Sequence, residues 1–179
     1  LYKSSGDHGE YVKMTIDRFG ISDVAVGARI SGNPGYDALR PTIGLSNSTV
    51  TSGTHGLEVD YIKNYVSQGP SGFTVTDSTV TAGQDVARAG DALKALGPRP
   101  EVKVTDSKLT SGTGGGIYVQ HVSGSGGVQS GNQFFVKVTN SQIVDTAADG
   151  IHYEDTKAIS YYSRVVEIEL DKATITGNA

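Results

Sequence analysis

The most chemically dense stretch of the sequence is Asp149-Gly-Ile-His-Tyr-Glu-Asp155, which holds three carboxylates and one imidazole in seven residues. Enzymes that cleave glycosidic bonds use two carboxyl groups about 5 to 9.5 Å apart, and the surroundings raise the pKa of the one that acts as the acid. The candidate catalytic residues of this chain are therefore Asp149, His152, Glu154 and Asp155. Three residues from elsewhere in the chain could supply a partner, namely Glu58, Asp85 or Tyr118.

Acidic and amide residues also recur at equivalent places, at Asn47, Asp77, Asp106 and Asn140. Carboxylates stacked at the spacing of strands would repel one another unless a cation or hydrogen bonds lay between them, so a metal ladder is one interpretation. The mixture of Asp with Asn instead favours turn residues that hydrogen-bond their own backbone. We expect no metal site, since His8, His55 and His121 also lack the paired spacing of zinc ligands.

Four tyrosines lie in or beside segments that vary in length and are rich in Gly, Pro and Ser: Tyr61, Tyr65, Tyr161 and Tyr162. Aromatic side chains on a polar surface can stack on sugar rings or anchor a protein contact. These tyrosines are the candidate ligand-binding residues. The alternative is that they cover apolar edges beneath the loops.

All these candidates must be positioned by a repeating scaffold, because six copies of one pattern run along the chain. The pattern reads apolar-x-apolar-polar-(Asp/Asn)-Ser-polar-apolar and is clearest in Phe73–Val80 and Val102–Leu109. It aligns two apolar columns, which advance by 29, 30, 29, 34 and 32 residues. The first column is Ile16, Leu45, Val75, Val104, Val138 and Leu170, and the second is Ile21, Val50, Val80, Leu109, Ile143 and Ile175.

A second short strand is expected seven or eight residues after the second column. It reads Gly56-Leu-Glu-Val59, Gly116-Ile-Tyr-Val119 and Gly150-Ile-His-Tyr153, with degenerate versions at Val24-Ala-Val26 and Val86-Ala-Arg-Ala89. The leading Gly suits a tight corner or a positive φ angle. Alternation along this strand would turn His152 and Glu154 toward solvent, which is the non-catalytic interpretation of the acidic stretch.

One such coil cannot satisfy its own backbone hydrogen bonds or bury its apolar face, whereas coils stacked about 4.8 Å apart do both. The sequence therefore predicts an all-β fold, a right-handed parallel β-helix of about six coils of roughly 30 residues. We expect residues 1–179 to form a single β-helix unit cut from a longer repetitive protein. A single helical turn is expected at Asp91–Gly97.

Composition narrows the function classes. The chain has no Cys, which excludes disulfides, thiolate metal sites and a Cys nucleophile. Its net charge of −4 is spread along the chain without a basic block, so nucleic acid is not an expected partner. No apolar stretch is long enough for a membrane span, and no cofactor is expected.

The segments Asn47–Leu57 and Asp106–Ile117 resemble autotransporter passenger domains of the pertactin and AIDA type. The resemblance rests on a strand that ends near Asn-Ser or Asp-Ser, an apolar residue, a Ser/Thr/Gly turn, and then Gly-Leu or Gly-Ile. It covers the chain from about Val12 to Ile175. The coils here, near 30 residues, are longer than those expected of that family.

The resemblance implies an extracellular protein at the bacterial cell surface, secreted through its own outer-membrane barrel. Such a passenger acts in adhesion, self-association or virulence without a catalytic centre, and its partner is a host-surface protein, a glycan or another copy of itself. The alternative starts from Asp149-Gly-Ile151, which is similar to a motif of polygalacturonase-like β-helix enzymes. It implies a polysaccharide lyase or hydrolase, or a phage tailspike, on the same fold.

Overall fold

The computed structural model describes residues 10–31, 39–62, 71–91, 100–121, 133–155 and 165–177. Over these ranges the chain is an all-β parallel solenoid without a helix, made of three sheets. The expected helical turn at Asp91–Gly97 lies outside the described residues, apart from Asp91 itself, which ends a strand. No helix in the described ranges is long and apolar enough to cross a membrane.

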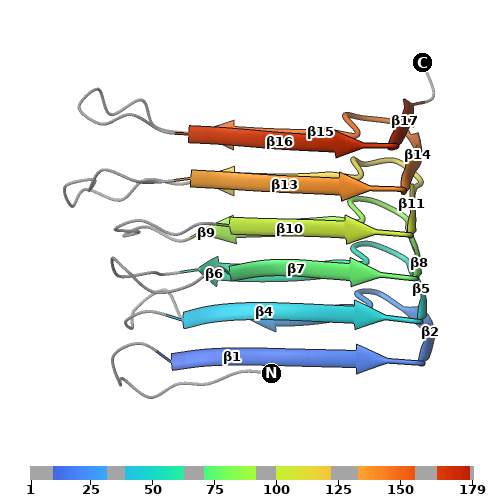
Figure 1. Cartoon of the computed structure of the whole chain (residues 1–179). Coiled ribbons are helices and arrows are strands. Elements are labelled where there is room, and N and C mark those ends of the chain that lie inside the picture. Colours follow the sequence, from blue (N-terminus) through green and yellow to red (C-terminus); the bar gives the residue numbers. More distant parts are fainter. Residues whose placement is uncertain are drawn as a thin grey trace.

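Every third strand joins the same sheet, and all neighbours are parallel. The first sheet contains β1 (Glu10–Asp17), β4 (Leu39–Ser46), β7 (Ser71–Thr76), β10 (Pro100–Thr105), β13 (Gln133–Thr139) and β16 (Val165–Asp171). The second contains β2 (Gly20–Val24), β5 (Thr49–Ser52), β8 (Thr79–Ala82), β11 (Lys108–Ser111), β14 (Gln142–Thr146) and β17 (Thr174–Gly177). The third contains β3 (Ala28–Ser31), β6 (Leu57–Ile62), β9 (Ala87–Asp91), β12 (Ile117–His121) and β15 (Ile151–Asp155). Figure 1 shows the strands of the first sheet stacked in chain order from β1 to β16.

Both predicted apolar columns are confirmed by the strand register. In the first sheet Leu45, Val75, Val104 and Val138 are successive partners. In the second sheet Val50, Val80, Leu109 and Ile143 are successive partners. All eight are at most 1% exposed and form the core together with the inward residues of the third sheet. Stacked β-branched and Leu side chains on a pleated face thus supply the buried interior.

The last members of both columns keep their inward register but are open to solvent. Leu170 pairs with Val138 and is 53% exposed, and Ile175 pairs with Ile143 and is 37% exposed. They lie on β16 and β17, beyond which no described strand follows. Burial therefore depends on a neighbour on each side along the stack.

The prediction for the third strand of the first copy is wrong. Val24-Ala-Val26 does not form it; β3 begins at Ala28, and Ala28 and Ile30 pair with Leu57 and Val59. Val24 instead ends β2 and is 36% exposed. The register of β2 against β5 shifts between Ile21 and Val24, because a bulge at this point adds one residue to β2.

The glycines before the third-sheet strands are explained by close approach of the backbone and not by a positive φ. None of Gly27, Gly56, Gly116 and Gly150 has a left-handed φ. A Cβ atom on Gly116 would lie 2.1 Å from Cγ2 of Ile143 and 2.6 Å from the carbonyl oxygen of Gly150. Of the two reasons expected for these glycines, only the tight corner holds.

Candidate functional site

The turn from the first sheet to the second holds the Asp/Asn residues, and each adopts a left-handed backbone conformation. The φ angles of Asn47, Asp77, Asp106 and Asn140 are 49°, 48°, 49° and 47°. Asn and Asp tolerate this conformation better than other residues that carry a Cβ. These residues are therefore turn residues, as the mixture of Asp and Asn predicted.

A serine follows each of them and forms a buried ladder along the stack. The hydroxyl of Ser78 donates to the carbonyl oxygen of Thr76 (2.7 Å) and accepts from the amide N–H of Ser48 (3.1 Å). The amide N–H of Ser78 in turn donates to the hydroxyl of Ser107 (3.1 Å), and that of Ser107 to the hydroxyl of Ser141 (3.0 Å). Each hydroxyl thus satisfies a carbonyl of its own copy and an amide of the preceding copy.

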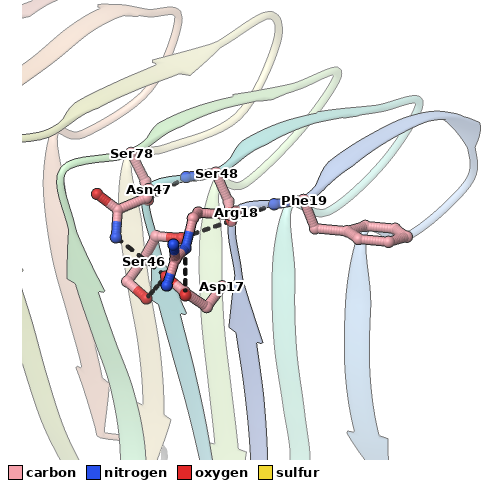
Figure 2. Close-up of polar contacts among 7 residues, drawn as sticks. All are labelled: Asp17, Arg18, Phe19, Ser46, Asn47, Ser48 and Ser78. Carbon is pink, nitrogen blue, oxygen red and sulfur yellow. Dashed lines mark hydrogen bonds and ion pairs between the residues drawn. The ribbon is translucent and has the colours of Figure 1, made fainter.

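At the start of the solenoid the turn carries a network of charged and polar groups. Figure 2 shows Asp17 accepting hydrogen bonds from Ser46 (2.7 Å) and Asn47 (3.0 Å), with Arg18 2.9 Å away. The bond from Asn47, then those from Ser46 and Arg18, lower the pKa of Asp17 from its ordinary value of 3.8 to about 2. The ladder begins beside this network, where the amide of Phe19 donates to the hydroxyl of Ser48 (3.0 Å).

Outside the serine ladder lies a shallow, open depression of about 440 Å³, which we call the turn depression. It spans three successive copies and is lined by Asp77, Ser78, Thr79, Asp106, Ser107, Lys108, Asn140 and Gln142. Asn140 donates a short hydrogen bond from its amide to the carboxylate of Asp106. The side chains of Asp77, Lys108 and Gln142 have no partner among the described residues.

The first sheet differs, because charged side chains on its outer face pair with one another. Lys103 Nζ lies 2.5 Å from Glu101, and Lys137 Nζ lies 2.7 Å from Glu169. The hydrogen bond and the charge of Glu169 raise the pKa of Lys137. These pairs leave their charges already compensated, so the unpaired polar groups of the turn depression are the better placed of the two sets to meet a ligand.

The candidate catalytic stretch forms a small cluster on the outer face of the third sheet. His152 Nδ1 lies 2.6 Å from Asp149 Oδ2, and the His152 ring stacks on Tyr118 with centroids 5.3 Å apart and planes at 15°. The side chains of His152 and Asp149 are 40% and 66% exposed, so neither is desolvated in the way that tunes a catalytic group. Glu154 and Asp155 lie on β15 in register with Gln120 and His121.

The other expected partners, Glu58 and Asp85, contact different residues. Glu58 Oε2 lies 3.4 Å from Nε of Arg29, and Asp85 Oδ2 lies 3.8 Å from Nδ1 of His55. Asp85 Oδ1 also accepts from the amide of Gly115 (2.9 Å). Of the three proposed partners only Tyr118 meets His152. Among the described residues no group of three His, Cys, Asp or Glu is placed to hold a metal ion.

Of the candidate ligand-binding tyrosines, Tyr61 lies within β6, next to its end at Ile62, and not in the loop that follows. Tyr65, Tyr161 and Tyr162 lie outside the described residues. The turn depression was not among the sites expected from the sequence. Its signal was the recurrence of a polar residue two places after the Asp/Asn position, at Thr79, Lys108 and Gln142.

Comparison with known proteins adds no family. No family model matches the chain, and no curated protein or solved structure matches it.

Proposed function

We propose that the chain is part of a passenger of autotransporter type, displayed on a bacterial surface and acting in adhesion or self-association. In this proposal the solenoid is a right-handed β-helix of about six coils of roughly 30 residues, and it serves as a rigid rod. The partner is a host-surface protein, a glycan or another copy of the chain. The parallel solenoid fold and the motifs Asn47–Leu57 and Asp106–Ile117 support this assignment.

The observation that carries the proposal is the regular polar surface of the second sheet. Its outward residues stack in register, with Thr49 beside Thr79 and a second row of Thr51, Thr81 and Thr110. These threonines are exposed or half-buried. A surface that repeats the same weak contact at every copy gains avidity without a deep pocket. Such a surface suits adhesion better than turnover.

The Asp149–His152 cluster with Tyr118 favours one other function, cleavage of a polysaccharide. A carboxylate, an imidazole and an aromatic ring at one surface are the groups that such a site uses. In that function the solenoid would be a glycan lyase or hydrolase.

One experiment separates the two functions. The chain is coupled to beads, and bead clumping and attachment to animal cells are measured for the wild type and for the triple variant His152→Ala, Glu154→Ala, Asp155→Ala. We expect clumping or attachment above that of bare beads, and the same level for the triple variant. The same two proteins are incubated with neutral and acidic polysaccharides, and new reducing ends and unsaturated products are measured. Cleavage that vanishes in the triple variant would replace adhesion by the enzymatic function, since losing an acid or base lowers turnover by orders of magnitude.

A further inference from the structure

We propose that the turn depression binds an extended, uncharged 1,4-linked glycan whose chain runs along the axis of the solenoid. This inference rests on the proposed adhesive function and names both the surface and the class of partner. It differs from the tyrosine sites expected from the sequence and from the Asp149–His152 cluster.

The first argument is the repetition of equivalent groups. Each of three successive copies presents the Asp/Asn side chain of its turn and the outward side chain two residues later. The three pairs are Asp77 with Thr79, Asp106 with Lys108, and Asn140 with Gln142. Parallel strands repeat at about 4.8 Å, close to the length that one pyranose unit adds to an extended 1,4-linked chain. Consecutive sugars would therefore meet equivalent polar groups.

The second argument is the chemistry of those groups. A carboxylate accepts two or more hydrogen bonds, an amide both donates and accepts, and an ammonium donates three. Sugar hydroxyls donate and accept in the same way, so they match this set. Asp77, Lys108 and Gln142 have no partner among the described residues, and a ligand would not have to break internal bonds to reach them.

The third argument is preorganisation by the ladder beneath the surface. Ser78 and Ser107 are 5% and 7% exposed, and their hydroxyls and amides are hydrogen-bonded along the stack. The backbone that carries Asp77 and Asp106 is therefore fixed before any ligand arrives, which lowers the entropy lost on binding.

Charge selects among glycans. The depression holds two carboxylates, Asp77 and Asp106, against one ammonium, Lys108. A polyuronate would bring a further carboxylate to every copy and would meet repulsion. An uncharged glycan offers the same hydroxyls without that penalty.

Titration calorimetry tests the proposal, with cello-, manno- and xylo-oligosaccharides of one to six units and with galacturonate oligomers of the same lengths. We expect binding of at least one neutral series, an affinity that rises with length up to about three or four units, and weaker binding of the uronates. The double variant Thr79→Val, Gln142→Leu removes two hydrogen-bonding groups at nearly unchanged volume. It should weaken the neutral oligosaccharide on the order of tenfold. The matched control Thr74→Val, on the outward face of the first sheet, should bind like the wild type.

A charge variant gives an independent readout. Asp77→Asn with Asp106→Asn keeps residues that tolerate the left-handed turn and removes both negative charges. Uronate oligomers should then bind at least as well as before, relative to neutral ones. Unchanged selectivity, equal affinity for monomer and tetramer, or equal binding by the double variant and the wild type would each overturn the inference. If bead clumping or cell attachment persists in the double variant while no glycan binds the wild type, the inference fails and the adhesive function stands. If the double variant instead lowers self-association in sedimentation, the occupant is a second copy and the glycan assignment is wrong.

Discussion

A Cβ atom placed on Gly56 would lie 2.4 Å from Cγ1 of Val80 in the following copy. The same relationship joins Gly27 to Val50, Gly116 to Ile143 and Gly150 to Ile175, at 2.3, 2.1 and 2.2 Å. In each pair the second residue is β-branched. The remaining position of this column is Val86, and the copy after it carries Leu109, whose Cβ bears one heavy atom only. Branching at Cβ in the second column thus accompanies glycine at the corner.

Substitution at the corner should destabilise the solenoid. Gly56→Ala brings its methyl group within 2.4 Å of Val80 and 2.6 Å of the carbonyl oxygen of Val86, so the backbone must shift. Overpacking of this kind costs about 1–3 kcal/mol of unfolding free energy. Urea unfolding followed by circular dichroism measures it. The control is Gly53→Ala in the same copy, whose nearest contact would be 3.8 Å away; a similar loss for both variants would contradict the prediction.

Val86 and Leu109 should be energetically coupled. Leu109→Ile adds a branch at Cβ where Val86 already fills the corner, so we expect it to lower stability. The loss should shrink when Val86→Gly is added. A double-mutant cycle in urea should give a coupling free energy on the order of 1 kcal/mol. Additive single effects would show that branching and glycine are unrelated.

The serine ladder predicts a local effect on one amide. Ser78→Ala removes the acceptor for the amide N–H of Ser48 and leaves it without that bond in a buried place. An unsatisfied buried group costs about 1–3 kcal/mol. Hydrogen exchange should accelerate at the Ser48 amide more than at amides of distant copies. Exposed Thr74→Ala is the control, and uniform protection in both variants would argue against the ladder.

Stability should fall between pH 4 and pH 2 in a way that depends on Asp17. Because the folded-state pKa of Asp17 is lowered to about 2, its contribution is present above the ordinary value of 3.8 and is lost as pH falls toward 2. The difference in melting temperature between the wild type and Asp17→Asn should therefore narrow over this window. A carbon-detected titration should also show that Ser46→Ala raises the pKa of Asp17. A pKa unmoved by loss of the Ser46 hydroxyl would contradict this cause.

A charge in the second column should be far more damaging than a change at the neighbouring turn. Leu109 is fully buried, and Leu109→Asp would place a carboxylate between stacked strands without a partner, at a cost of several kcal/mol. Asp106→Asn keeps a residue suited to its φ of 49° and should cost little. Thermal melts compare the two, and similar midpoints would count against the column.

The repeat predicted the sheets because its spacing of five residues between columns survives in every copy, and stacking then fixes the register. The third strand of the first copy was misplaced because Val24 and Val26 alternate like a strand, whereas the spacing of seven after Ile21 points to Ala28. The turn depression could not be predicted from any one motif. It arises only when side chains about 30 residues apart, such as Asp77 and Lys108, are stacked as neighbours.

The hydrogen bonds between copies run along the stack, and this direction has a mechanical consequence. Tension applied to the two ends would load the terminal copy first, because it has a neighbour on one side only. Releasing one copy of roughly 30 residues would lengthen the chain by about 100 Å. A tethered rod of this kind would yield stepwise under drag, and each step would relieve the force on the bond at its tip before that bond broke.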